Sequence, residues 1–443
     1  MKHYRAWQCS CWIVLLLLCS YSAIAGKTLT LQEITQIARA NNKDLKAARY
    51  NVAIAKARLI QAGLWPNPSV NLSNNDDRLF NNEGEYSRSA GFSQAFPISG
   101  RIAKQKTVAR LDVMKAMAEI REAERQLSAK VANAFYAAVI TERRLQQLNY
   151  LLRINKELVN VIHNRYHAAE ISKLDENAAR IEYLRIVQEK HLLHSLRISQ
   201  MATLNQLMGR DANSPLSLKA DLNTGQKFPN LPILKELALN NRPDLQSIAL
   251  SINRAIADRR LAKAERFADW TVGLGVQQDK IVVEEGPPQP ADRTLGVTLS
   301  VPLPLLNQNQ GRILEASRTG TQAMMALRAL NLSIKTEIAS NYAQLKALRM
   351  SLRETQSVSL KIGVESVKLA RDSYENGQIS LLNVLQVQKQ QNDLQMTYLT
   401  TLEKYLQVYV ALCTAIGPGS TQGFCPYLAY QRNGYDDGIT TAN

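Results

Sequence analysis

The fold is decided by residues 270–276, which read WTVGLGV and place an apolar side chain at every second position. After a loop, residues 295–301 (LGVTLSV) repeat the same period of two. Alternation of this kind predicts a β-strand with one apolar face. We therefore expect the two stretches to form a β-hairpin over about residues 270–301.

A weaker copy of this pattern lies nearer the N-terminus. Residues 65–68 (WPNP) end a helical pattern, and Val70 and Leu72 then alternate with polar residues. Residues 76–86 are rich in Asn, Asp and Gly, as expected of a loop. The apolar residues that follow it at alternating spacing are Ala90, Phe92 and Phe96. A second hairpin is predicted over about residues 69–96.

These strands have the length and two-faced character of a membrane β-barrel wall, whose strands need about 9–11 residues. An ordinary soluble hairpin is the alternative that the pattern leaves open. Four strands cannot close a barrel, because open edges in lipid leave backbone groups unpaired at several kcal/mol each. Insertion into a membrane would therefore require several copies of the chain.

The chain repeats itself at an offset of about 200 residues. Residues 38–45 (ARANNKDL) match residues 238–245 (ALNNRPDL), and the tripeptide GRI recurs at 100–102 and 311–313. In both halves a Tyr-x4-Ile-Ser motif, ending at Ser172 or Ser380, precedes a glycine by 37 residues. Tandem duplication predicts the following division: signal peptide 1–25, first repeat 26–209, linker 210–230, second repeat 231–417 and C-terminal tail 418–443.

Helices too long for a compact core follow each hairpin. Residues 101–168 contain neither proline nor glycine, and a helix of that length extends about 100 Å. Apolar and small residues recur at four-three spacing, which predicts a left-handed coiled-coil seam. The first seam is Leu127, Val131, Ala134, Ala138, Thr141, Leu145, Leu148, Leu152, Asn155, Val159, Ile162 and Tyr166. The second is Leu345, Leu348, Leu352, Thr355, Ser359, Ile362, Ser366 and Leu369, returning through Val387, Gln391, Leu394, Tyr398, Thr401, Tyr405, Val408 and Leu412.

The N-terminus reads as an export signal. Basic residues precede an apolar stretch, and small residues at 23 and 25 predict cleavage after Ala25. Lipidation needs a small residue directly before the modified cysteine. Leu18 precedes Cys19 and Gln8 precedes Cys9, so we expect no lipidation at these cysteines. Of the five cysteines only Cys413 and Cys425 remain after cleavage, and a disulfide between them is favoured over two free thiols.

The formal net charge of +16 falls to +14 when Lys2 and Arg5 leave with the signal peptide. A basic chain suggests nucleic acid, but here the positive residues punctuate helices without forming a groove with interleaved aromatics. No phosphate loop, His-Glu-x-x-His motif or nucleophile elbow is present, so we expect no enzyme, no cofactor and no nucleic-acid partner. Aromatics at only 6%, beside abundant Ala, Leu, Gln, Arg and Lys, fit long helices, and hydrophobic residues at 45% with charged residues at 21% exclude a disordered chain.

The signal peptide, the duplication, the hairpin-plus-long-helix pattern and the turn at residues 374–385 (YENGQISLLNVL) together resemble the TolC family of outer-membrane efflux proteins. Residues 301–311 (VPLPLLNQNQG) are similar to the cobalt-zinc-cadmium efflux branch of that family.

The resemblance implies a mainly α-helical fold with membrane β-strands. Long helices would form a coiled-coil periplasmic barrel, and four β-strands per chain would complete a 12-stranded outer-membrane β-barrel in a homotrimer. The implied partners are a periplasmic membrane-fusion (adaptor) protein, an inner-membrane RND-type pump and outer-membrane lipid. The implied function is a passive exit duct, for divalent heavy-metal cations in that branch. Alternatives are drug or protein export, or a periplasmic coiled-coil adaptor or structural protein.

The resemblance also implies where partners meet the chain. The turns far from the strands would dock the adaptor through Ile171, Ser172, Lys173, Gly377, Ile379, Ser380 and Leu381, although Ala169 stands where the first turn should have glycine. A periplasmic gate would fall at Asp175, Asn383 and Gln386. His163 and His167 are spaced one helical turn apart and are weak metal candidates, but no third ligand is evident, so we expect no metal site.

Overall fold

The computed structural model describes residues 28–77, 84–220, 222, 228–283, 286–287, 289–418 and 425–428. The described residues divide into two compact units. Unit 1 takes the described residues of Met1–Ala47, Arg121–Arg242 and Leu332–Asn443, and unit 2 takes those of Ala48–Ile120 and Pro243–Asn331. The predicted signal peptide lies outside the described residues.

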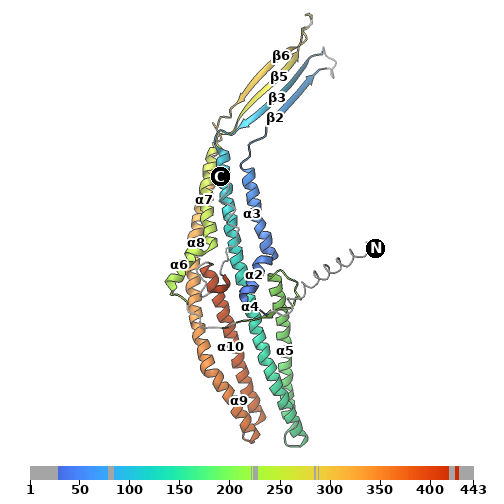
Figure 1. Ribbon diagram of the computed structural model, residues 1–443, viewed down its shortest axis with the longest axis vertical. Coiled ribbons are helices and arrows are strands. Elements are labelled where there is room, and N and C mark those ends of the chain that lie inside the picture. The colour runs from blue at the N-terminus through green and yellow to red at the C-terminus, as the bar shows by residue number, and fades with distance from the viewer. Residues whose placement is uncertain are drawn as a thin grey trace, which may run out of the picture. The chain divides into compact units, whose positions relative to one another are not determined.

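Unit 2 contains a four-stranded antiparallel sheet in the order β2-β3-β5-β6. Its strands are β2 (Ser69–Asp76), β3 (Tyr86–Phe96), β5 (Trp270–Lys280) and β6 (Asp292–Ser300). Both predicted hairpins are present, and β3 pairs with β5 along its whole length to join them. The four strands lie side by side in Figure 1.

The strand register gives the sheet two unlike faces. Val70 lies opposite Phe92, Phe92 opposite Leu274, and Leu274 opposite Val297, so one face is a continuous apolar row. Leu72, on the same face, is 76% exposed and Val297 is 71% exposed. The neighbouring register row, on the other face, is Asn71, Gly91, Gly275 and Gly296. An apolar face of this size left open in a single chain indicates that something outside the chain covers it.

The helices carry most of the rest of the chain. Their bounds are α2 (Leu31–Asn41), α3 (Lys43–Gln61), α4 (Arg101–His167), α5 (Lys173–Leu207), α6 (Leu231–Asn241), α7 (Pro243–Ala264), α8 (Gln310–Glu354), α9 (Leu360–Glu375) and α10 (Leu381–Ile416). A π-helical turn, η3 (Thr355–Ser359), separates α8 from α9. A short parallel pair, β1 (Thr28–Leu29) with β4 (Ser217–Leu218), lies in unit 1. Among the described residues, no helix is both long and apolar enough to cross a membrane.

The predicted coiled-coil seams are confirmed over most of their length. Every predicted seam residue of α4 and of α10 is buried or half-buried. In α9, however, the predicted seam residues Ile362 and Leu369 are 56% and 59% exposed, so this part of the prediction was wrong. The π-helical turn accounts for the difference, because it adds one residue per turn and moves the buried positions by one. Gly363 accordingly packs against α10, and Ala370 is buried in place of Leu369.

The internal duplication places a similar hydrogen bond at two matching helix junctions of unit 1. The Asn42 side chain, between α2 and α3, donates to the Leu207 carbonyl at 3.0 Å. At the matching place in the second half, Arg242 donates to the Ala415 carbonyl at 3.1 Å. The glycines that follow the two returning helices, at positions 209 and 417, both have positive φ and lie against these same junctions. The side chains thus satisfy carbonyls that the ends of α5 and α10 leave unpaired.

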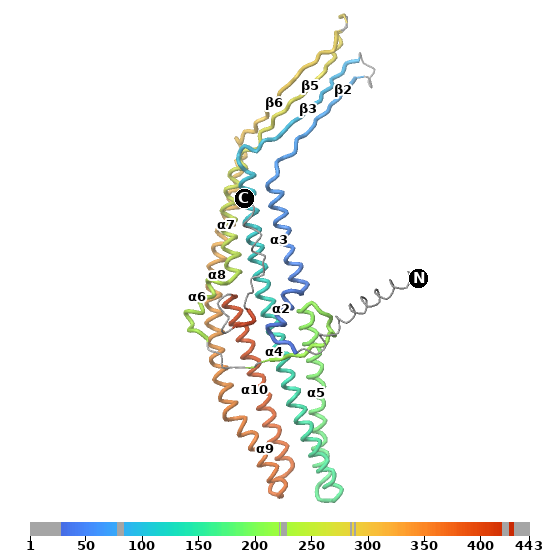
Figure 2. The backbone as a smooth tube through the Cα atoms, viewed as in Figure 1, coloured from blue at the N-terminus to red at the C-terminus, as the bar shows by residue number. Residues whose placement is uncertain are grey.

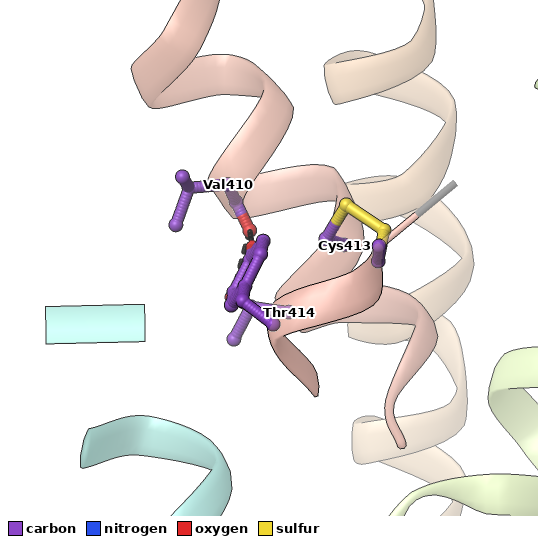
Figure 3. Close-up of a disulfide and its surroundings, with 5 residues drawn as sticks. Val410, Cys413 and Thr414 are labelled. Atoms are coloured by element: carbon purple, nitrogen blue, oxygen red, sulfur yellow. Dashed lines mark hydrogen bonds between the residues drawn. A yellow bond between two sulfur atoms is a disulfide. The ribbon is translucent and has the colours of Figure 1, made fainter. Parts of the chain in front are cut away.

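A disulfide fastens the end of the described chain to α10. Cys413 and Cys425 are bonded with their Cα atoms 5.8 Å apart (Figure 3). The segment η4 (Pro426–Leu428) follows, and the Tyr427 hydroxyl in it donates to the Val410 carbonyl at 3.3 Å. Arg39 of α2 donates to the Tyr427 carbonyl at 3.3 Å. The segment at residues 425–428 therefore links α10 to α2.

Candidate functional site

The candidate site is the pair of turns that join α4 to α5 and α9 to α10 in unit 1. Both turns lie at the same end of that unit in Figures 1 and 2. In the first, Ala169 donates to the Tyr166 carbonyl at 2.9 Å and Glu170 to the Arg165 carbonyl at 2.9 Å. This is a Schellman motif, in which a residue of positive φ ends the helix.

The second turn repeats the motif atom for atom. Gly377 donates to the Tyr374 carbonyl at 3.0 Å, and Gln378 to the Ser373 carbonyl at 2.8 Å. Gly377 has φ 72°, and Ala169 has φ 59° at the matching place in the first turn. Alanine in the left-handed region costs about 1–2 kcal/mol. The turn that lacks the expected glycine therefore adopts the glycine geometry at the expense of strain.

Serine caps begin both returning helices. Ser172 Oγ accepts from the Asp175 backbone N–H at 3.2 Å, and the Asp175 carboxylate accepts from the Ser172 backbone N–H at 3.3 Å, which forms a capping box. Ser380 Oγ accepts from the Asn383 backbone N–H at 3.4 Å. Of the predicted gate residues, Asp175 is thus held in a helix cap, whereas Asn383 and Gln386 have exposed side chains.

The two turns share a small apolar cluster. Ile162, Ala179 and Leu381 are buried together, and half-buried Ile171 and Tyr374 pack against them. The predicted docking residues therefore divide by exposure. Leu381 is buried and Ile171 and Ile379 are half-buried, whereas Ser172, Lys173, Gly377 and Ser380 are exposed. The surface left open for a partner is a small polar one around the two turns.

A buried carboxylate, which sequence reasoning missed, ties α4 to α5. Glu176 is 3% exposed, and its carboxylate contacts His163 Nδ1 at 2.9 Å and forms an ion pair with Lys173. Lys173, and after it His163, lower the pKa of the Glu176 carboxyl from its ordinary 4.5 to about 2, against the opposing effect of burial. Glu176 is therefore ionised at neutral pH. The three-residue spacing from Lys173 to Glu176 was the available sequence signal.

Two cation–π contacts lie near the two turns. The Lys173 ammonium lies 4.6 Å from the centre of the Tyr166 ring, and the Arg165 guanidinium 5.4 Å from that of Tyr374. The Arg165 contact joins α4 of the first helix pair to α9 of the second, and it was not predicted from sequence. Within the described ranges, no three His, Cys, Asp or Glu residues lie close enough together to hold a metal ion.

Comparison with known proteins identifies relatives over nearly the whole chain. The family described as outer membrane efflux protein matches residues 34–210 and 234–418. The cobalt-zinc-cadmium resistance protein CzcC of Cupriavidus metallidurans is 23% identical, covering 89% of this chain and 91% of its own. The pyoverdine export outer membrane protein OpmQ of Pseudomonas aeruginosa is 25% identical, covering 88% and 85%.

Solved structures share the fold. A crystal structure of CusC superposes with a TM-score of 0.72 at 18% identity, covering 88% of this chain and 92% of its own. The CmeC outer membrane channel of Campylobacter jejuni has a TM-score of 0.68 at 15% identity, covering 87% and 85%. The arrangement of long helices and four strands is therefore that of TolC-like outer-membrane channels.

Proposed function

Because the chain belongs to the outer membrane efflux protein family, we propose that it is the outer-membrane channel subunit of a tripartite efflux system. In this assembly it acts as a passive exit duct, driven by an inner-membrane pump through a periplasmic adaptor. It has no catalytic role, since the family consists of efflux channels and not enzymes. Residues 1–25 act as a signal peptide cleaved after Ala25, without lipidation, and the mature chain is built from the repeats 26–209 and 231–417.

The observation that carries the proposal is the open, two-faced sheet of unit 2. Its apolar face exposes Leu72, Leu274 and Val297, while the other face carries serine, threonine and glycine. Both edge strands, β2 and β6, have a neighbour on one side only in the described chain. In lipid each unpaired backbone group costs several kcal/mol, so the edges require strands from other copies.

The strand directions allow such closure. All three pairings in the sheet are antiparallel, so β2 and β6, at opposite edges of a four-stranded sheet, run in opposite directions. β6 of one copy can therefore pair with β2 of the next in the same antiparallel manner. Three copies would form a 12-stranded barrel with the apolar face toward lipid and the polar face toward the lumen.

The two turns of unit 1 are the adaptor-docking surface in this proposal. Ser172, Lys173, Gly377 and Ser380 are exposed there, and Ile171 and Ile379 supply half-buried apolar surface beside them. Asn383 and Gln386, with Asp175 in its helix cap, are the candidate gate residues. The exposed polar surface favours a reversible partner, because a permanent interface is usually more apolar.

For the cargo we propose divalent heavy-metal cations. The support is the similarity to CzcC along most of both chains. The weaker similarity to OpmQ makes small organic molecules the competing cargo class.

Two experiments test the proposal. The protein should fractionate with the outer membrane as a detergent-stable trimer and conduct ions in planar bilayers, and a soluble monomer without conductance would refute the channel. Deletion of the gene should reduce tolerance of zinc, cobalt or cadmium. Unchanged metal tolerance with new sensitivity to detergents or drugs would refute the metal cargo and leave the channel intact.

A further inference from the structure

Two imidazoles face each other on the last turn of α4. His163 and His167 are four residues apart on the helix, and their ring centres lie 4.4 Å apart with an angle of 79° between the ring planes. The His163 side chain is 52% exposed, and His167 is also exposed, so solvent reaches the pair. Histidines at this spacing lie on one face of a helix and can chelate one ion.

The ring separation fits shared coordination. A metal ion binds imidazole nitrogen at about 2.0–2.1 Å. Two imidazoles that bind one ion side by side, at angles of roughly 90° to 110°, then have ring centres about 4.5 to 5 Å apart. The observed 4.4 Å lies just below this range. Shared coordination requires the exposed His167 ring to turn until one of its nitrogens faces the same ion as His163, which its contact with Glu176 holds in place.

The buried carboxylate of Glu176 orients one of the two rings. Its contact is with His163 Nδ1, at 2.9 Å, and its second oxygen is paired with the Lys173 ammonium. A carboxylate in an ion pair accepts hydrogen bonds, so Nδ1 of a neutral His163 donates to it, and Nε2 keeps the lone pair that a metal ion needs. Metal-binding histidines characteristically donate their other ring N–H to a carboxylate in this way.

We propose that His163 and His167 bind a divalent transition-metal ion at the end of α4, with Glu176 as the positioning residue. Imidazole ligands favour Cu²⁺, Ni²⁺ and Zn²⁺ over Mg²⁺ and Ca²⁺, which prefer oxygen. Since the described residues bring no further His, Cys, Asp or Glu to the pair as a third ligand, water completes the coordination and the ion exchanges readily. Asn164 follows the first histidine, where zinc hydrolases have their glutamate, so the site has no hydrolytic base.

This site goes beyond the proposed efflux function and does not depend on the cargo. It lies beside the exposed turn that precedes Lys173, so an ion bound there would fix the end of α4 next to the candidate docking surface. The competing explanation of the same contacts is purely structural: His163 would only tie α4 to α5 through Glu176. The two explanations differ in their dependence on His167, which has no part in that tie.

The test is metal binding by the full-length protein, purified in detergent with a tag that contains no histidine. Equilibrium dialysis against Cu²⁺, Ni²⁺ and Zn²⁺ should give one ion per chain, and Mg²⁺ should give none. His167→Asn should weaken binding at least tenfold. His194→Asn, on α5, is the matched control and should leave binding unchanged. Glu176→Gln should weaken affinity about tenfold while the stoichiometry stays at one.

A second measurement uses the unaltered protein, so it does not depend on the variants folding. Diethylpyrocarbonate modification, mapped by mass spectrometry, should fall at His163 and His167 when Zn²⁺ is added, and should stay constant at His191 and His194. Binding that His167→Asn leaves intact, or equal protection of all four histidines, would overturn the proposal. Absence of any bound ion at a metal concentration of about 100 micromolar would also overturn it.

Discussion

A charge placed on the apolar face of the sheet should prevent membrane insertion, whereas a charge on the other face should be tolerated. Two neighbouring positions of β2 allow a matched comparison. Leu72 lies on the apolar face near the middle of β2 and is 76% exposed in the single chain. Asn71 lies on the other face, opposite Gly91, where a longer side chain has room. We predict that Leu72→Arg prevents stable insertion and that Asn71→Arg is tolerated.

The expected magnitude follows from the lipid-facing position. Arginine at the middle of a lipid-facing strand costs about 2–4 kcal/mol, and a lumen-facing substitution costs little. Since a tenfold change corresponds to about 1.4 kcal/mol, the folding equilibrium per chain should fall roughly 30- to 700-fold for Leu72→Arg. In a trimer the cost recurs in each of the three chains.

The assay is urea-dependent folding into lipid vesicles, followed by the heat-modifiable trimer band on a gel. Leu72→Arg should shift the folding midpoint to much lower urea, and Asn71→Arg should stay near the unaltered protein. Equal midpoints for the two variants, or a larger loss for Asn71→Arg, would refute the assignment of the apolar face to lipid.

Three further predictions concern unit 1. Replacing Cys413 and Cys425 by serine should lower the free energy of unfolding by about 3 kcal/mol, as expected for a loop of this length. Proteolysis of the C-terminal segment should become faster, and unchanged cleavage rates would contradict this. Because the pKa of Glu176 is lowered to about 2, its contribution to stability is complete above about pH 4.5 and is lost as pH falls toward 2. The acid loss of helical circular dichroism should therefore be smaller in Glu176→Gln, and identical acid profiles would count against the ion pair. Ala169→Gly should raise the thermal midpoint by relieving about 1 kcal/mol of strain, whereas Gly377→Ala should lower it, and the reverse order would exclude the shared turn geometry.

Much of the fold was predictable because two periodicities in the sequence are strong. The period of two in residues 270–276 predicted β5, and four-three spacing from Leu127 to Tyr166 predicted the buried stripe of α4. What local pattern could not predict was the π-helical turn at Thr355–Ser359. One extra residue in a helical turn leaves composition unchanged, yet it exposes Leu369 and buries Ala370.

The candidate site was predictable only in outline. The repeated motif located both turns, but Asp175 was interpreted as a gate residue without regard to the serine three positions earlier, whose cap it completes. Glu176 was missed, because its partner His163 lies on α4, which meets α5 only after the two helices pack together, and the spacing from Lys173 alone does not indicate burial. Contacts across a turn depend on tertiary packing, which sequence spacing alone does not specify.

If the sheet closes only with strands from other copies, its two edges meet between neighbouring chains, and cysteine cross-linking between β2 and β6 detects this contact. Ser73→Cys in β2 would be combined in turn with Thr294→Cys, Thr298→Cys or Ser300→Cys in β6, all on the polar face. Within one chain these edges are separated by two intervening strands, a distance of about 14 Å, which is too far for a disulfide. Oxidation of membranes should therefore give covalent dimers and trimers, and no larger species, for at least one pair. Monomers alone with every pair, or an open-ended ladder of larger species, would contradict the account.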